Sequence, residues 1–172
     1  RVCKWMRKEL VPHAEKVLLV GKDTSSAAVA DFTQSFCCFH SNKVTLECKG
    51  VGPARLEMLC SGIEAVVSGG ARAWLVKLSL YGNILTQQKH LAFGDEGAGR
   101  LAGVLGKCET LAYLNLACNC ISSVGIERLA VALVKCKALV HIDLADNGIG
   151  DEGAGELAAV LRECPAIEHL NL

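Results

Sequence analysis

The sequence predicts an α/β solenoid segment, in which short parallel strands form one sheet and helices cover its outer side. Two repeated patterns indicate this fold class. The stretch Leu111–Asn119 recurs 28 residues later as Leu139–Asn147, and a third copy begins at Ile167. The helix-forming stretch Gly94–Leu105 likewise recurs almost letter for letter as Gly150–Leu161. A fixed period of this length predicts stacked units that share a core.

The same period divides residues 1–172 into a single domain of successive units. Residues 1–11 look like the tail of a preceding repeat's helix, and 14–74 contain two degenerate repeats. Residues 75–110 form a repeat with an eight-residue insertion, 111–138 and 139–166 are regular 28-residue repeats, and 167–172 begin another. The chain starts without methionine and stops within a repeat, so we expect it to be part of a longer chain or a larger complex.

Each unit has residues that suit a strand, a turn and a helix. The leucines of L-x-x-L-x-L are expected to point inward from the strand. In the two degenerate units, strands are predicted at Val17–Val20 and Val44–Leu46, with helices over residues 27–37 and from Pro53 to about Val67. Helix residues such as Leu101, Val104 and Leu105, and their counterparts Leu157, Val160 and Leu161, are expected to pack onto the strand leucines.

An asparagine stands where each well-formed unit leaves its strand, and these residues are Asn83, Asn119 and Asn147. A buried side-chain amide at this position can satisfy backbone groups that no sheet partner reaches. We therefore expect a structural asparagine ladder. Lys22 and Lys49 take the corresponding place in the degenerate units, so the ladder is expected to be broken there.

Composition narrows the classes of function. Lys plus Arg and Asp plus Glu number 18 each, which gives no overall field that favours nucleic acid. There is no signal peptide and no apolar run long enough to span a membrane. Cys108, Cys136 and Cys164 recur at 28-residue spacing after helical patterns, so we interpret the ten cysteines as reduced residues of an intracellular protein, not secreted, rather than as a disulfide framework.

The period of 28, the GDEGAGxLAxVL helix start and the C-x-x-L boundary between units resemble the ribonuclease-inhibitor-type leucine-rich repeat. Repeats of that type also occur in NOD-like receptors and in the Ran GTPase-activating protein. The resemblance is close over residues 94–172 and weak before residue 73. It implies a horseshoe with a parallel sheet on its concave face, helices on its convex face, and a concave binding surface. The resemblance does not define a partner, because such repeats serve many unrelated ones.

In that architecture, the third, fifth and seventh positions of each unit line the concave face. We expect a partner-binding strip there, with Tyr81, Tyr113 and His141 as anchors; the alternative is a polar surface without a partner. This register puts Thr45 in the fifth row and Glu47 in the seventh. The predicted partner-binding residues are Lys16, Lys43, Lys77, Ser79, Tyr81, Tyr113, Asn115, His141, Asp143 and His169.

Two subsets of polar residues leave alternatives open. Lys16, Lys43 and Lys77 fall in one row, which predicts either a site for an acidic partner segment or a solvated face. The insertion, within residues 84–93, contains Gln87, Gln88, Lys89 and His90 and either carries recognition or is tolerated variation at the rim.

The residue patterns do not favour catalysis, a metal or another cofactor. Cys118 and Cys120 lack the paired spacing of a zinc site, and the register predicts both as buried filler. His141 and Asp143 have no nucleophile placed by the repeat to meet them. We therefore expect a non-enzymatic module for binding or scaffolding proteins. The alternatives are a structural subunit that contacts neighbours through the rim, helices or ends, and, more distantly, a GTPase-activating protein.

Overall fold

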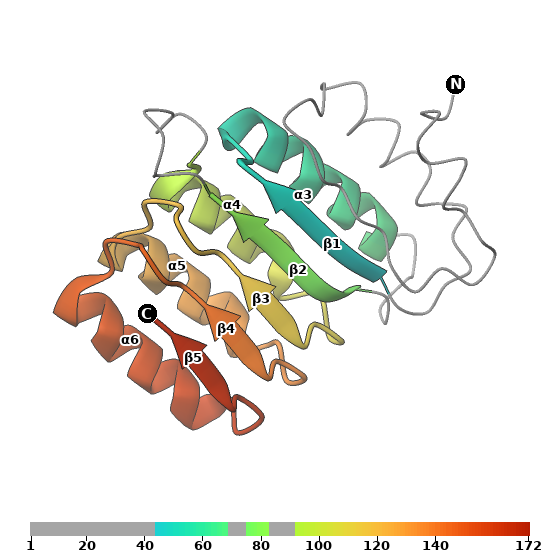
Figure 1. Cartoon of the computed structure of the whole chain (residues 1–172). Helices are drawn as coiled ribbons and strands as arrows, with labels where there is room; N and C mark the ends of the chain where they lie inside the picture. The colour runs from blue at the N-terminus through green and yellow to red at the C-terminus, as the bar shows by residue number, and fades with distance from the viewer. Residues whose placement is uncertain (1–43, 69–74, 83–91) are drawn as a thin grey trace, which may run out of the picture.

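The computed structural model describes residues 44–68, 75–82 and 92–172, which form a two-layer α/β solenoid (Figure 1). One sheet has the strand order β1-β2-β3-β4-β5, with every neighbouring pair parallel. The strands are β1 (Val44–Lys49), β2 (Leu75–Tyr81), β3 (Tyr113–Asn115), β4 (His141–Asp143) and β5 (His169–Asn171). The helices between them are α3 (Pro53–Ser68), α4 (Gly94–Leu105), α5 (Ser123–Leu133) and α6 (Gly150–Glu163).

The predicted fold class is confirmed. Pro53 is the first residue of α3. The helices α4 and α6 each begin at the first glycine of a GDEGAG sequence, Gly94 and Gly150 respectively. The strand and helix predicted before residue 44 lie outside the described residues. Among the described helices, none combines the length and the apolar character needed to cross a membrane.

The solenoid curves because its two layers have different natural spacings. Neighbouring strands lie about 4.8 Å apart, whereas packed helices lie about 8–10 Å apart. Successive units are therefore closer together on the sheet side than on the helix side, and the stack bends towards the sheet. Figure 1 shows the helices together on one side of the sheet, so the other side of the sheet is the inner, concave face.

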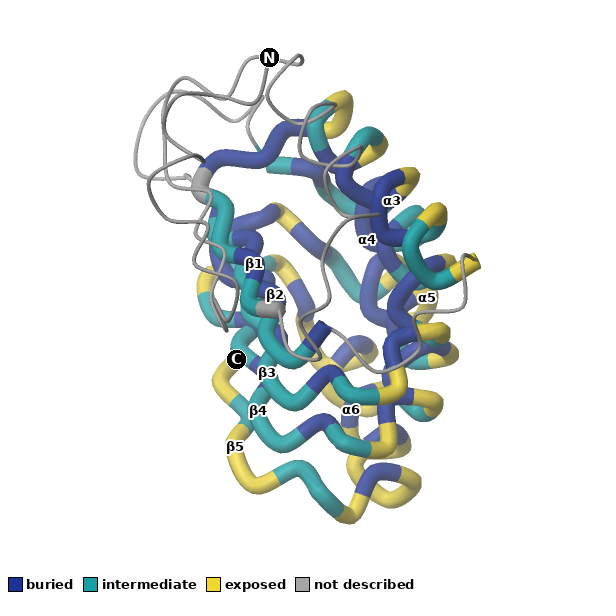
Figure 2. Tube along the Cα trace, turned by 90° about the vertical axis from the view of Figure 1, so that its right-hand side faces the viewer, coloured by how far each residue is buried: buried dark blue, intermediate teal, exposed yellow. Residues whose placement is uncertain are grey.

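The core lies between the sheet and the helices and continues from one unit to the next (Figure 2). The strand leucines fill its inner half, and Leu78, Leu114 and Leu116 are fully buried. Helix residues such as Leu101 and Leu129 close it from the outer side and are equally buried. Cys108, Cys136 and Cys164 are also buried and free, as predicted, at the boundaries between units.

Two thiols at these boundaries contact the preceding unit. The Cys136 thiol lies 3.3 Å from the carbonyl oxygen of Leu105, and the Cys164 thiol lies 3.4 Å from that of Leu133. Each thiol thus donates to the C-terminal end of the helix in the preceding unit, α4 for Cys136 and α5 for Cys164. A small, weakly donating side chain suits a position where one helix ends against the next strand.

The asparagine ladder is confirmed at both of its described positions. The Asn119 amide nitrogen donates to the carbonyl oxygens of Leu80 at 2.6 Å, Leu116 at 3.0 Å and Ala117 at 3.0 Å. The Asn147 amide repeats this pattern one unit later, towards Leu116 and Leu144. Its oxygen accepts from the backbone N–H groups of Asn119 and Ile121. Each asparagine therefore joins its own turn to the preceding unit.

Gly82 allows this close approach between β2 and the turn after β3. Its N–H donates to the carbonyl oxygen of Ala117 at 2.8 Å. A Cβ atom at Gly82 would lie 1.7 Å from the carbonyl oxygen of Cys118 and 2.9 Å from the Oδ1 atom of Asn119. The position therefore has no space for a side chain.

The predicted register of the second degenerate unit was wrong by two residues. In the sheet, Thr45 is opposite Lys77 and Glu47 is opposite Ser79, with an irregularity between Val44 and Thr45. Thr45 therefore belongs to the third row and Glu47 to the fifth. The physical reason is that Leu46 and Cys48, rather than Val44 and Leu46, pair with Leu78 and Leu80, so a thiol takes the second of these apolar positions.

The break in the asparagine ladder consequently falls at Val51 and not at Lys49. Gly50 donates to the Tyr81 carbonyl, just as Gly82 donates to that of Ala117. The next residue, Val51, therefore takes the asparagine position, and its side chain is buried. An apolar residue there adds to the core instead of bonding to backbone groups.

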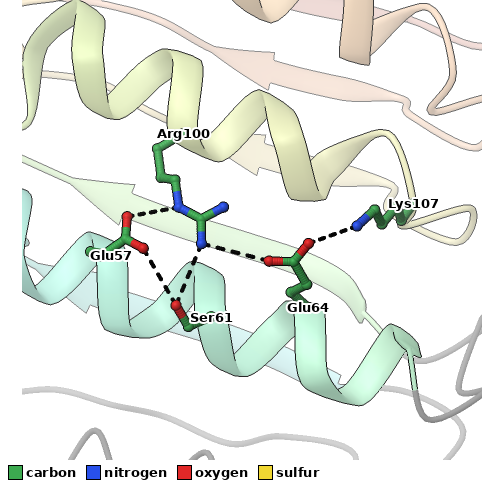
Figure 3. Close-up of polar contacts among 5 residues, drawn as sticks. All are labelled: Glu57, Ser61, Glu64, Arg100 and Lys107. Atoms are coloured by element: carbon green, nitrogen blue, oxygen red, sulfur yellow. Dashed lines mark hydrogen bonds and ion pairs between the residues drawn. The ribbon is translucent and has the colours of Figure 1, made fainter.

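Charged side chains on the outer face tie α3 to α4 (Figure 3). The Arg100 guanidinium lies 2.7 Å from Glu57 and 3.6 Å from Glu64, and the Lys107 ammonium lies 2.9 Å from Glu64. The opposite charges of neighbouring helices therefore connect the degenerate unit to the next one. Contacts of this kind at an exposed surface direct helix alignment more than they add stability.

The last helix packs less completely than the sequence predicted. Leu161 is 37% exposed, although its counterparts Leu105 and Leu133 are 0% and 1% exposed. Leu161 has neighbours on only one side within the described residues, because α6 is the last helix of the stack (Figure 1). The expected packing of Leu161 is thus corrected, whereas Leu157 and Val160 are buried as expected.

Replacing Asn119 with alanine is expected to lower the free energy of unfolding by about 2–3 kcal/mol, because buried carbonyl groups lose their donor. Denaturant unfolding followed by circular dichroism measures this change. The control is Asn171→Ala, at an exposed asparagine with one hydrogen bond, to Asp143. It should stay within about 0.5 kcal/mol of the unmodified protein. Equal effects of the two substitutions would contradict the ladder's structural role.

Candidate functional site

The concave face carries a row of side chains from the third position of each unit. Lys77, Tyr113, His141 and His169 lie opposite one another on β2, β3, β4 and β5. The strands are parallel and in register, so residues that are 28 or more positions apart in sequence become neighbours. We call these four residues the ring row.

The side chains of the ring row contact each other in sequence. The Lys77 ammonium lies 4.4 Å from the centre of the Tyr113 ring, which is a cation–π contact. The Tyr113 and His141 rings are stacked, with centres 4.5 Å apart and an interplanar angle of 11°. The His141 and His169 rings lie 5.3 Å apart and are tilted by 43°. Three rings and one ammonium group therefore form a continuous series across four strands.

Lys77 is held at the start of this row by an acidic residue. Its ammonium lies 2.7 Å from the Glu47 carboxylate on β1. The expected row of lysines is therefore changed in its described part, because the β1 residue opposite Lys77 is Thr45 and the nearby charge is negative. The charge of Lys77 is largely compensated within the face.

A second row is formed by residues from the fifth position of each unit, and hydrogen bonds connect these residues to one another. The Asn115 amide donates to the Oδ2 atom of Asp143 at 2.8 Å, and the Asn171 amide donates to its Oδ1 atom at 3.1 Å. The backbone N–H of Ala145 also donates to Asp143, and that of Ala117 donates to Asn115. Asp143 thus receives neutral donors from three strands or their exits, and none of these donors carries a positive charge.

A third group lies where the strands end. The Cys118 thiol is 3.4 Å from the Oδ2 atom of Asp146 one unit later. A hydrogen bond with the Cys118 side chain raises the pKa of Tyr81, and the charges of Asp146 and Asp143 act in the same direction. Burial raises the pKa of Cys118. Tyr81, Cys118 and the two aspartates therefore form one electrostatic group across three units.

The turns at this edge have an unusual backbone. Cys118 and Asp146 both have positive φ, at 60° and 55°. This left-handed conformation is uncommon for residues other than glycine, although aspartate tolerates it better than most. It turns the chain sharply out of β3 and β4 and helps to place both side chains at the strand exits.

Eight of the predicted partner-binding residues lie on the described part of the concave face. They are Lys77, Ser79, Tyr81, Tyr113, Asn115, His141, Asp143 and, at the more exposed end, His169. The remaining predicted site residues fall outside the described residues. These are Lys16, Lys43, Asn83, Gln87, Gln88, Lys89 and His90.

Sequence reasoning put Glu47 in the wrong row of this face because of the shifted register. It also did not find the contact between Asp146 and Cys118. The signal that could have found this contact is the correspondence of the two residues, because Cys118 stands at the same place one unit earlier. Cys120 was also misjudged: it is exposed, because the turn points its side chain to solvent, and not buried filler.

The thiols that pack in or against the core have raised pKa values and are therefore poor nucleophiles. Burial raises the pKa of Cys48, Cys60 and Cys108 each to about 12, and that of Cys136 to about 11. A thiol with a raised pKa contains little of the nucleophilic thiolate. Within the described ranges, no three His, Cys, Asp or Glu side chains gather in a way that could hold a metal ion.

Comparison with known families agrees with this architecture. Residues 107–130 and residues 135–158 each match the family model described as Leucine Rich repeat. The matches cover the units of β3 with α5 and β4 with α6. Together with the parallel sheet, they define an α/β leucine-rich repeat solenoid. Repeats of this kind are typical protein–protein interaction modules. No curated protein matches the chain.

Cysteine modification should separate the exposed thiol from the buried ones. We expect iodoacetamide at pH 8 to alkylate Cys120 quickly and to leave Cys108 and Cys136 at least about tenfold slower, because burial and a raised pKa both disfavour reaction. Peptide mapping by mass spectrometry after timed quenching measures each site. In denaturant the rates should converge, and fast labelling of Cys108 in the folded protein would contradict its buried position.

Proposed function

We propose that this solenoid binds another protein through its concave face. The observation that carries the proposal is the continuous ring row, in which the Tyr113 and His141 rings are stacked on each other. Rigid rings lose little conformational entropy on binding, so they suit a role as anchors. The adjoining Asn115–Asp143–Asn171 row is already ordered by its own hydrogen bonds. A partner would therefore meet a surface that is largely preorganised.

Polar groups on this face that are free to form hydrogen bonds support the same proposal. Among the described residues, the Tyr113 hydroxyl and the His141 and His169 imidazoles have no hydrogen-bond partner within the protein, and their rings are only partly buried or exposed. Polar atoms at the edges of ordered rings offer both donors and acceptors to a partner. They can orient a bound segment without requiring this face to rearrange.

We further propose that the module works by binding and not by catalysis, and that it belongs to a reducing, intracellular compartment. The buried thiols, whose pKa values are raised, suit a structural role and are poor nucleophiles. The free, buried cysteines at the unit boundaries suit an environment that does not form disulfides. The 28-residue period and a full helix in each regular unit support a ribonuclease-inhibitor-type repeat and the proposed unit boundaries.

A second candidate is a structural subunit whose contacts come from its helices. The observation that favours it is the exposed apolar surface of α5, where Val124 is 46% exposed and Val131 is 67% exposed. Both residues are directed away from the core, on the outer side of the solenoid. A GTPase-activating role is less supported, because the described Arg100 and Arg128 already bond to Glu57 and to the Asp95 carbonyl.

Site-specific photo-crosslinking tests which face meets a protein. We expect a photoreactive benzophenone amino acid at Ser79, between Glu47 and Asn115 on the concave face, to crosslink a partner when the protein is expressed in its native cells. The matched position is Val131 on the outer face of α5. The readout is the identity and yield of crosslinked partners by mass spectrometry.

The two positions give opposite answers for the two candidate functions. Crosslinks from Ser79 that are lost when Tyr113 is replaced by alanine support the concave face as the binding surface. Crosslinks from Val131 with none from Ser79 would favour the helix-mediated subunit and contradict our proposal.

A further inference from the structure

We propose that the concave face receives a basic segment of its protein partner, with a lysine or arginine side chain placed at Asp143 and Asp146. This inference rests on the proposed function and adds the chemistry of the partner. It reverses the expectation of an acidic partner that the lysines in the sequence suggested. The argument comes from the charges on this face and from what already compensates each of them.

The lysine of this face whose side chain the structure describes, Lys77, already has partners. Lys77 forms an ion pair with Glu47 at 2.7 Å and also lies over the Tyr113 ring. An acidic partner would have to compete with Glu47 for this ammonium group. Lys77 and Glu47 together add no net charge, so they provide little attraction for a segment of either sign.

The two aspartates, in contrast, have no cationic partner among the described residues. Asp143 accepts hydrogen bonds from the amides of Asn115 and Asn171 and from the Ala145 N–H, all of which are neutral. Asp146 is exposed and meets the Cys118 thiol, also neutral. Within the described residues, neither carboxylate has a lysine or arginine in an ion pair. The uncompensated charge on this part of the face is therefore negative.

The charges of Asp143 and Asp146 both affect the same group, the Tyr81 hydroxyl. Both charges reach the Tyr81 hydroxyl and contribute to raising its pKa, after the larger effect of the Cys118 hydrogen bond. Asp143 lies on β4 and Asp146 just after it, on the turn that the left-handed conformation of Asp146 shapes. A single cationic side chain in front of Tyr81 is thus placed to interact with both aspartates.

The ring row supplies a second kind of contact for a basic segment. The Lys77 ammonium already shows that a cation can lie over a ring of this face, at 4.4 Å from Tyr113. His169 is exposed at the other end, where no further ring covers its outer side in the described structure. The planar guanidinium of arginine stacks on such rings and also pairs with carboxylates, so arginine fits both features.

Synthetic peptides test the partner's chemistry directly. The probes are two fluorescent ten-residue peptides, one alternating arginine with serine and one alternating glutamate with serine, titrated to millimolar concentration against the full chain. Fluorescence anisotropy at low and moderate salt gives the affinities. We expect the arginine peptide to bind more tightly, with an affinity that falls as salt screens the charges.

Charge-neutral variants assign this binding to the proposed place. Asp146→Asn is expected to weaken the arginine peptide about threefold to tenfold, in the range of one partly exposed charge pair. The control is Asp151→Asn, which removes the same charge at an exposed position at the start of α6 and should change the affinity little. Circular dichroism of both variants confirms that the fold is kept.

Three results would overturn the inference. They are equal or tighter binding of the glutamate peptide, no binding of the arginine peptide at millimolar concentration, and equal effects of Asp146→Asn and Asp151→Asn. If crosslinking from Ser79 still captures a partner in any of these cases, the concave face remains the binding surface and the basic chemistry is wrong. If both experiments fail, the proposed function fails as well.

Discussion

The buried amide of Asn119 is the interaction on which this architecture depends. β3 and β4 are each three residues long, so the sheet ladder ends almost as soon as it begins. The chain must then turn inside the core, where unpaired carbonyl groups would be costly. The Asn119 side chain meets the carbonyl of Leu80 in the preceding unit and those of Leu116 and Ala117 in its own. One side chain thus closes a turn and joins two units.

Regular stacking of these turns produces the surface. Because every unit leaves its strand at the same point, equivalent side chains on β2 to β5 lie in line across the sheet. Rings that are distant in sequence, such as Tyr113 and His141, then stack at 4.5 Å. The core sets the positions, and the concave residues are free to vary in chemistry. Recognition by this chain is therefore a matter of which side chains stand in each row.

The charges of the two faces show how the same residue types serve different purposes. On the helical side, Arg100 is paired with Glu57 and Glu64 and aligns α3 with α4. On the sheet side, Lys77 is paired with Glu47, whereas Asp143 is surrounded by neutral donors. A carboxylate that is ordered by neutral donors has no opposite charge beside it, and this distinguishes Asp143 from Glu57 and Glu64, which are paired with Arg100 between α3 and α4.

The sequence by itself determined the fold class and the burial of Cys108, Cys136 and Cys164, and it placed Asn119 and Asn147 where their strands end. Each of these follows from a repeated local pattern, and the packing of a residue such as Leu114 is the same in every copy. It also identified Tyr113 and His141 as neighbours, because the period of 28 places them in one row. The tertiary structure decided the pairing of β1, in which Leu46 is opposite Leu78 and the Glu47 carboxylate reaches Lys77. It alone also showed that Asp143 and Asp146 act together, because their compensation depends on contacts across units that no local pattern encodes.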